Sequence, residues 1–356
     1  MNYDLKLELR YQSLSILKYL KAPFLKFSPT KEVSIDEYLK KNKSASIQNF
    51  EENESYILTL LNGRVWSSNG TVITEDNILI SEINRTLLKE KRNSVFYQKS
   101  VINPQIKTGV AAIVAQPAGN VYYHWMIDIL PRIELLKKAD EFDSIDYFVF
   151  NEIKYPFQKE TLKIFGIPEN KIIEVKNLWN YHFQFDKLIF PSFTSELNRA
   201  TYFTIKTLEK YIYPKQKTSQ GKQFYKKIYL SRSKAPNRKL LNEQEVLCLL
   251  KAEGFYEIFP EEYSVIEQAE IFANAEVIVG VHGSAFTNIA FCKPATKVID
   301  ICAPEWVNDC FLEITKLRGL VYIRITGNQF LGIKGIDKGA NISLHDSKIK
   351  FLMEQV

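Results

Sequence analysis

The last third of the sequence alternates short apolar segments with amphipathic segments, and no other feature constrains the fold as strongly. The apolar segments are rich in Ile and Val, as buried strands are, and the segments between them have helical spacing. Strands that alternate with helices form a parallel sheet with helices on its faces. The expected strands cover residues 227–230, 255–259, 276–281 and 297–301, and the expected helices cover 242–252, 264–273 and 284–292. The sequence therefore predicts an α/β protein.

The first half repeats this alternation less regularly and begins with a β-rich part. Short strands are expected at 56–61, 64–67 and 71–74, and an Asn-Gly turn joins the last two. A buried strand at 109–115 then leads into a helix over 120–138. Further strands are expected at 146–151, 172–175 and 187–190, with a helix at 158–165. This half also reads as an α/β domain.

The length of 356 residues fits two domains of ordinary size. A segment rich in Pro, Lys, Gln and Ser at 212–222 separates the two halves and has the composition of a linker. We therefore expect two α/β domains around a cleft. Residues 1–211 would form the first, with an irregular β-containing start, and residues 212–356 the second, whose last helix could pack back on the first domain.

The charge of the chain is concentrated in one segment. The formal net charge is +6, yet residues 215–239 hold nine basic and no acidic side chains, so subtracting these nine leaves −3 for the rest. A basic segment at the start of the second domain predicts an anionic ligand such as a diphosphate, and its lysines could face an anionic acceptor or a membrane surface. No motif suggests a basic groove with interleaved aromatic residues, so no nucleic-acid partner is expected.

Cysteine usage and hydropathy predict a cytoplasmic protein. No apolar run approaches the roughly 18 residues needed to span a bilayer, and no apolar stretch follows Met1. The four cysteines show no CxxC pairing, which indicates a reducing compartment and argues against both a disulfide scaffold and a zinc knuckle. They are expected to be small buried side chains; they are Cys248, Cys292, Cys302 and Cys310.

The segment EVIVGVHGSAFTN is the sharpest local feature. An expected strand ends there, and His282, Gly283 and Ser284 turn the chain into a helix. Small residues let a ligand approach the backbone, and the free N–H groups of a helix start favour an anion such as a diphosphate. Thr287 and Asn288 could add side-chain bonds one turn later. The alternative is a tight structural turn whose histidine bonds a neighbouring carbonyl.

A second candidate site lies on the expected helix over 120–138. His124, Asp128 and Arg132 are four residues apart and form one polar stripe on an otherwise apolar helix. His124 and Asp128 could supply a base and its orienting carboxylate, or they could be a satisfied pair in the core. Pro131 should kink or end this helix, because proline lacks an N–H and clashes with the preceding turn.

A third candidate site follows the expected strand at 227–230. This strand brings Ser231 and Arg232 to its carboxyl end, with Lys234 and Arg238 close behind. Ligands bind at this edge of a parallel sheet, and arginine contacts phosphate oxygens in a bidentate way. The lysines could equally belong to a solvated loop.

Two weaker candidates remain in the same half of the chain. Glu262, with Ser264 and Gln268, follows a strand and could reach a ribose or sugar hydroxyl, although a helix N-cap at Ser264 explains the same residues. Asp300 and Glu305 flank the last expected strand and are equally ambiguous.

Together these segments resemble glycosyltransferase family 61. The resemblance covers about residues 105–305, in the order of the family, and its most specific part is the turn that begins at His282 and ends at Asn288. The matching residues are Asn120-x3-His124-x3-Asp128 with the following Leu-Pro, then Ser231-Arg232, then Glu267-Gln268, and finally Val279-Gly280-x-His282-Gly283-Ser284-x-x-x-Asn288. Ser284 stands where the family usually has alanine, a harmless change at a small position.

The resemblance implies a GT-B-like pair of Rossmann-type domains facing a central cleft, and an inverting transfer from a nucleotide sugar, usually a UDP-sugar. The second domain would hold the donor, with its diphosphate at Arg232, Arg238 and the turn at 282–284. His124 and Asp128 would act from the first domain, either one as the base, with Asn120 and Arg132 on the acceptor side. The side chains expected to contact the nucleoside or sugar of the donor are Ser231, Glu262, Thr287 and Asn288.

The implied reaction needs no cofactor. Without a DxD-type metal motif, the charge on the leaving diphosphate would be stabilised by basic side chains and the helix start, so a metal-independent enzyme is expected, with metal assistance left open. The absence of the signal anchor of eukaryotic members favours a bacterial cytoplasmic enzyme of surface polysaccharide synthesis, at the inner membrane face or free. A binding protein that keeps this fold without turnover is the alternative. A hydrolase is disfavoured, because the GxSxG elbow is absent.

Overall fold

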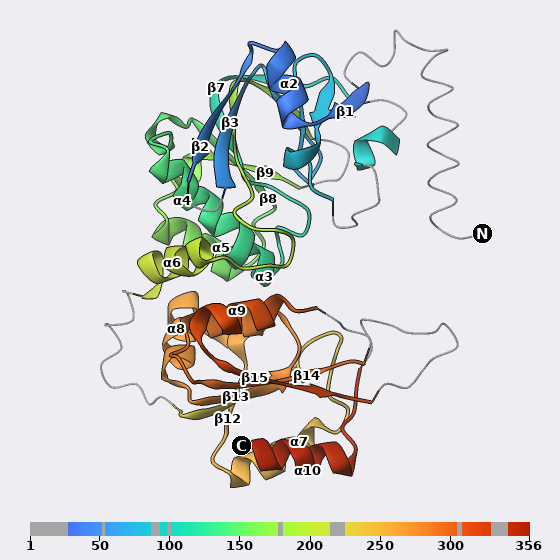
Figure 1. Cartoon of the computed structure of the whole chain (residues 1–356), viewed down its shortest axis with the longest axis vertical. Helices are drawn as coiled ribbons and strands as arrows, with labels where there is room; N and C mark the ends of the chain where they lie inside the picture. Colours follow the sequence, from blue (N-terminus) through green and yellow to red (C-terminus); the bar gives the residue numbers. More distant parts are fainter. Residues whose placement is uncertain are drawn as a thin grey trace, which may run out of the picture. The chain divides into compact units, whose positions relative to one another are not determined.

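The computed structural model describes residues 28–51, 54–86, 93–97, 101–176, 181–213, 225–304, 308–328 and 341–356. The chain divides into two compact units, residues 1–197 and 198–356, each with its own sheet and hydrophobic core (Figure 1). Both sheets contain parallel strands and carry helices, as the α/β prediction requires. Among the described residues, no helix has the length and apolar character that crossing a bilayer would require.

The first unit is built on a mixed sheet in the order β2-β3-β10-β7-β8-β9, with β4 paired to both β10 and β5. Strands β10, β7, β8 and β9 are parallel, whereas β2, β3 and β10 pair antiparallel. The strands are β1 (Lys31–Val33), β2 (Ala45–Phe50), β3 (Ser55–Leu61), β4 (Arg64–Trp66), β5 (Thr71–Ile73), β6 (Ile78–Ile80), β7 (Gln105–Ile113), β8 (Tyr147–Asn151), β9 (Ile172–Val175) and β10 (His182–Pro191). The helices apart from the long one are α2 (Ile35–Lys41) and α5 (Pro156–Ile164), with 3₁₀ turns at η3 (Ser81–Ile83), η4 (Ser94–Tyr97), η6 (Phe142–Ser144) and η7 (Glu169–Lys171). The predicted β-rich start and the βαβ part that follows it are confirmed.

The long helix of the first unit contains a π turn. It runs through α3 (Tyr122–His124), the π turn η5 (Trp125–Ile129) and α4 (Leu130–Lys138). Pro131 does not end it, contrary to one of the two expected outcomes. The Leu130 N–H bonds to the Trp125 carbonyl, five residues earlier, which makes a π turn just before the proline. The regular α-helical hydrogen bonds that a proline ring would disturb are therefore already interrupted at this point.

The second unit is a five-stranded parallel sheet in the order β12-β11-β13-β14-β15. Its strands are β11 (Lys227–Leu230), β12 (Tyr256–Ile258), β13 (Val277–Val281), β14 (Lys297–Cys302) and β15 (Val321–Thr326). Its helices are α6 (Tyr202–Tyr211), α7 (Glu243–Ala252), α8 (Val265–Asn274), α9 (Cys310–Arg318) and α10 (Asp346–Gln355), with 3₁₀ helices η9 (Pro260–Glu262) and η10 (Ser284–Phe291). Figure 1 shows α8 and α9 on one face of this sheet and α7 and α10 on the other. The predicted alternation is confirmed, except that η10 is a 3₁₀ helix.

The strand order of the second unit fixes where a ligand can approach. The chain starts at β11, moves outward to β12, and then returns to β13 on the other side of β11. The order in which strands are added therefore reverses between β11 and β13, and in doubly wound sheets ligands bind outside the carboxyl ends of the strands at this point.

Two segments of the second unit bear on the expected domain limits. Helix α6 contacts η10, and Glu209 in α6 pairs with Arg318 in α9, so the compact units divide before α6 rather than at residue 212. Helix α10 packs against α7 and adds Ile349 and Leu352 to the core of the second unit. The roles assigned to the two domains stay a prediction.

His182 is a buried titratable group at the start of β10. Its side chain is 2% exposed, it pairs across the sheet with Trp66 in β4, and its Nδ1 lies 2.6 Å from the Ile102 carbonyl oxygen. Burial lowers the pKa of His182 from about 6.5 to about 4, although the bond to Ile102 acts in the opposite direction. The imidazole is therefore neutral in the folded state at neutral pH, with Nδ1–H donating to the carbonyl.

Acidification should destabilise the first unit through His182. Because the pKa is lower in the folded state, the unfolded chain binds the proton first, and the contribution of His182 to stability is lost as the pH falls from about 6.5 toward 4. Between pH 7 and pH 5 this one group should lower the free energy of unfolding by about 2 kcal/mol. Urea unfolding of the wild type and of His182→Asn at both pH values tests it. The asparagine amide can still donate to Ile102 but cannot titrate, so equal pH dependence in the two proteins would contradict the prediction.

Candidate functional site

A buried polar cluster surrounds the π turn of the first unit. His124 Nδ1 lies 2.7 Å from Asp128 Oδ2, and the two side chains are 12% and 2% exposed. Asp128 also accepts bonds from Gln116 Nε2 at 3.2 Å and from Ser195 Oγ at 3.4 Å. These bonds hold the carboxylate in place. When His124 donates its Nδ1 proton to Asp128, its Nε2 is an acceptor, which is the arrangement of a base with an orienting carboxylate.

Arg85 completes this cluster and was not predicted from the sequence. Its Nη1 lies 4.0 Å from Asp128 Oδ1, and its Nη2 donates to the Ser195 carbonyl at 2.6 Å. The guanidinium lies 3.8 Å from the centre of the Phe193 ring. Burial lowers the pKa of Arg85, and the charge of Asp128 opposes that shift. Arg85 follows η3 outside any periodic segment, so no sequence signal marked it.

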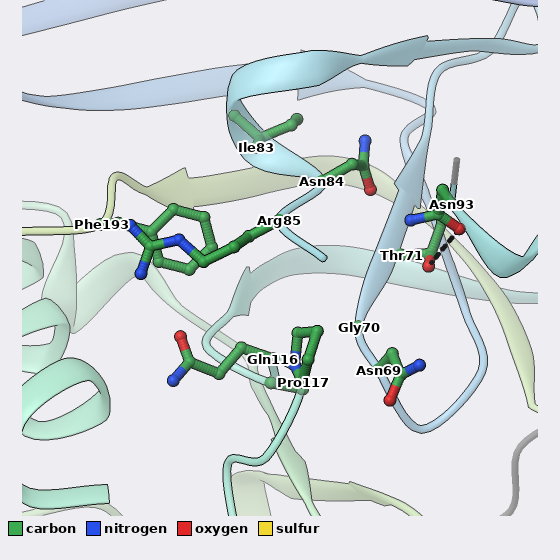
Figure 2. Close-up of a pocket in the computed structure, with 11 residues that line it drawn as sticks. Asn69, Gly70, Thr71, Ile83, Asn84, Arg85, Asn93, Gln116, Pro117 and Phe193 are labelled. Carbon is green, nitrogen blue, oxygen red and sulfur yellow. Dashed lines mark hydrogen bonds between the residues drawn. The ribbon is translucent and has the colours of Figure 1, made fainter. Parts of the chain in front are cut away.

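A pocket of the first unit borders the cluster (Figure 2). Arg85 and Gln116 both line it, and both approach the Asp128 carboxylate. Figure 2 shows these two side chains on one side of the pocket and Asn69 and Asn93 on the other. The other lining residues are Gly70, Thr71, Ile83, Asn84, Ala115, Pro117 and Phe193. The lining is rich in amide groups, which suits hydroxyl groups as ligands.

Arg132, the third residue of the expected polar stripe, has a structural role. Its side chain is fully buried, and its Nε, Nη1 and Nη2 donate to the carbonyls of Pro191, Val114 and Ile113 at 2.8, 2.9 and 2.8 Å. Burial lowers the pKa of Arg132 to about 9, with Arg85 acting in the same direction and Asp128 against it. The guanidinium therefore joins the ends of β7 and β10.

Asn120 lies in the turn before α3. Its Oδ1 is buried and has no hydrogen-bond partner within the described part of the chain. Its expected role on the acceptor side stays a prediction.

In the second unit, Arg232 and Gly283 meet at the carboxyl edge of the sheet. Arg232 follows β11 and Gly283 follows β13, and these strands are parallel neighbours. A Cβ atom on Gly283 would lie 2.2 Å from Arg232 Nη1. The backbone of Gly283 is extended, so space for the guanidinium, and not backbone conformation, is what requires a glycine here.

The guanidinium of Arg232 is held by the loop that follows it. Its Nε donates to the Arg238 carbonyl at 3.2 Å and its Nη2 to the Asn237 carbonyl at 3.1 Å. Burial, and then the charge of Arg238, lower the pKa of Arg232 to about 10, so it stays charged at neutral pH. Arg238 is also partly buried, with a left-handed φ of 54°. Two guanidinium groups therefore lie near the switch point of the sheet.

Ser231, Glu262 and Ser264 have partners within the protein. Ser231 Oγ donates to Glu243 Oε1 at 3.1 Å. Glu262 in η9 pairs with Lys234, whose Nζ lies 4.0 Å from the centre of the Phe259 ring. Ser264 caps α8 by accepting from the Glu267 N–H at 3.2 Å, which is the capping alternative considered from the sequence.

The structure encloses three of the residues expected to bind the donor. His282 is 4% exposed, with its Nδ1 2.8 Å from Asp300 Oδ2. Asn288 is fully buried and donates to Gln268 Oε1 in α8 at 2.7 Å, while Thr287 Oγ1 is buried without a hydrogen-bond partner among the described residues. Ser284 is more accessible than these. Their roles toward a donor stay predictions, and Glu305 lies outside the described residues, as do residues 214–224 of the basic segment.

The chain matches a protein-family model, segments of curated proteins and a solved structure. The family model described as Glycosyltransferase 61 matches residues 122–299, half of the chain, a range that includes His124, Asp128, Arg232 and Gly283. The EGF domain-specific O-linked N-acetylglucosamine transferase of Rattus norvegicus is 29% identical over 93 residues, 24% of this chain and 17% of that protein. The same enzyme of Drosophila melanogaster is 30% identical over 97 residues, 26% of this chain and 18% of that protein. The chain therefore matches less than a fifth of the length of these curated relatives. Among solved structures, E. coli heptosyltransferase WaaC with ADP matches with a TM-score of 0.31 and 12% identity, over 70% of this chain and 97% of that chain.

Replacing Arg132 by methionine should destabilise the first unit strongly. Methionine fills much of the space but leaves three buried carbonyl groups without their donor, so the free energy of unfolding should fall by at least about 3 kcal/mol. Urea unfolding measures the loss. Lys138→Met removes an exposed charge from the end of the same helix and should change stability little; equal effects of the two substitutions would contradict the structural role of Arg132.

Proposed function

The chain belongs to glycosyltransferase family 61, and from this premise we propose that it is an inverting glycosyltransferase that moves a sugar from a UDP-sugar to a hydroxyl of a saccharide acceptor. The second unit would bind the donor and the first unit would supply the base. A GT-B-like arrangement, in which the two units face a cleft, is part of this proposal.

The observation that carries the proposal is the close approach of Arg232 to Gly283. The missing Cβ of Gly283 leaves room for a charged guanidinium beside the start of η10, at the switch point of a parallel sheet. A guanidinium and free backbone N–H groups both bind phosphate oxygens. A nucleoside diphosphate is the ligand that this combination fits best, and Arg238 would add a second positive charge.

The first unit offers the chemistry that inversion needs. In a single in-line displacement, a base takes the proton of the acceptor hydroxyl, the hydroxyl oxygen bonds to the sugar C1, and the C1–O bond to the diphosphate breaks. We propose that His124 takes the proton through Nε2 while Asp128 orients the ring through Nδ1. The departing diphosphate carries the negative charge, which Arg232 and Arg238 stabilise, so no added divalent metal is required.

We further propose an acceptor and a setting for the reaction. The pocket lined by Arg85 and Gln116 borders the His124–Asp128 pair and is small, so it would take no more than a single hydroxyl group of the saccharide acceptor. Of the lysines before Ile228, the structure describes Lys226, which pairs with Glu276 at 2.7 Å, and Lys227. Contact of this basic segment with an anionic acceptor or a membrane surface is part of the proposal. We propose as the setting bacterial surface polysaccharide synthesis in the cytoplasm, with a glycan or a lipid-linked saccharide as acceptor at the inner membrane face.

UDP should stabilise the protein, and Arg232 should be required for this effect. UDP at about 100 times its Kd should raise the free energy of unfolding by about 2.7 kcal/mol, seen as a rise in Tm. Arg232→Ala should weaken UDP binding roughly 10- to 100-fold, because a charge-assisted bond to phosphate is lost. Lys226→Ala is the matched control, since Lys226 precedes β11 and lies at the opposite end of the same strand.

Thermal shift with UDP, GDP and CDP, followed by calorimetric titration of the variants, measures these effects. If none of the three nucleotides or their sugars stabilises the wild type, the donor site is wrong. Equal losses in Arg232→Ala and Lys226→Ala would mean that the charge acts at a distance and not at the switch point.

His124→Gln should lower kcat strongly and leave donor binding intact. Loss of a general base typically lowers kcat by about 10²- to 10⁴-fold, while the UDP-induced rise in Tm should persist because the substitution lies in the other unit. Release of UDP from UDP-sugars in the presence of saccharide acceptor pools measures kcat. His345→Gln, at an exposed histidine before α10, is the control and should retain full activity. A wild type that binds UDP-sugars but never releases UDP with any acceptor would instead be a binding protein.

A further inference from the structure

A second cluster of side chains lies on the other side of β13, and the proposed reaction does not use it. His282 follows β13, while Asp300 and Cys302 lie two residues apart in the neighbouring strand β14 and so point to the same face. His282 Nδ1 is 2.8 Å from Asp300 Oδ2 and 3.7 Å from Cys302 Sγ. The nitrogen, oxygen and sulfur atoms all lie within 4.8 Å of one another, and all three residues are buried.

Asp300 gives an independent reason to expect a cation here. Its side chain is completely buried. Its Oδ2 accepts the Tyr322 hydroxyl at 2.7 Å in addition to facing His282, whereas its Oδ1 has no hydrogen-bond partner in the described part of the chain. A buried carboxylate oxygen without a partner is costly, and coordination to a metal ion is one of the ways in which proteins satisfy it.

Cys310 lies beside this cluster on a different element, α9. It is the first residue of α9 and is 4% exposed. Its neighbour Phe311 packs against His282, with ring centres 4.9 Å apart. Burial, and then the negative charge of Asp300, raise the pKa of Cys310 to about 12, and the same two causes raise the pKa of Cys302.

We propose that His282, Asp300 and Cys302 bind a zinc ion. Imidazole nitrogen, carboxylate oxygen and thiolate sulfur are all zinc ligands, and a thiolate selects zinc over magnesium or calcium. On binding, the Cys302 thiol releases its proton to solvent and bonds to the ion as a thiolate. The ion would join β13 to β14 and fix the turn that carries Gly283. The three ligands are buried on the β14 side of β13, whereas Arg232 follows β11 on its other side, so the ion is distinct from the metal-independent transfer proposed above.

The zinc content of the purified protein tests this site directly. The full chain, expressed with zinc in the medium and purified under reducing conditions, should contain about one zinc per chain by mass spectrometry. Cys302→Ala should lose the zinc. Cys292→Ala is the matched control and should keep it, because Cys292 is a buried thiol of the same unit that follows η10.

Cobalt provides a second readout that does not depend on the variants folding. Co²⁺ added alone to the zinc-free wild type should give thiolate-to-metal absorption in the near ultraviolet and the visible bands of tetrahedral Co²⁺. Folded wild type that binds neither Zn²⁺ nor Co²⁺ overturns the proposal, as does thiolate absorption that survives in Cys302→Ala. UDP binding is measured in a separate experiment. A protein that binds no zinc can therefore still confirm the donor site, and a protein that binds no UDP can still confirm the zinc site.

Discussion

The second unit depends on the parallel pairing of β13 with a strand on each side. Pairing with β11 brings the turn after β13 against Arg232, and pairing with β14 brings the same turn against Asp300. Consecutive residues of an extended chain point in opposite directions, and Gly283 is extended. The end of β13 can therefore contribute to two sites. His282 points toward β14, and the space beside Gly283, which has no side chain, accommodates the Arg232 guanidinium beside β11.

In the first unit, the corresponding constraint is the burial of charge beside the helix. Two guanidinium groups, Arg85 and Arg132, lie near one carboxylate, Asp128. Arg132 offsets the cost of its desolvation by donating to three backbone carbonyls. The Asp128 carboxylate can therefore interact with His124 and Arg85. The expected stripe of three polar residues assumed a regular α-helix. A π turn contains more residues than an α turn, so the helical residues after it are rotated relative to those before it, and Arg132 binds the strands of the sheet instead of the His124–Asp128 pair.

The sequence predicted the elements of the fold better than the partners of its polar residues. Hydrophobic periodicity is a local signal, and it located the strands of the second unit and the His124–Asp128 pair, which are four residues apart on one helix. The placement of β10 between β3 and β7, and of Arg85 beside Asp128, depends on contacts between residues far apart in the chain, which no local pattern encodes. Asn288 shows the same limit: the motif marked it, but its burial against Gln268 follows from how η10 packs on α8.

The cysteines show why spacing alone is a poor guide to a metal site in a parallel sheet. A zinc knuckle uses pairs close in sequence because one short loop must supply the ligands. A parallel sheet gathers the carboxyl ends of strands that are separated by whole helices, so ligands twenty residues apart can meet, as His282 and Cys302 do. The lack of a CxxC pair excludes a knuckle but not a site assembled by the sheet. The same principle brings Arg232 to Gly283, so one property of the topology underlies both the proposed diphosphate site and the proposed zinc site.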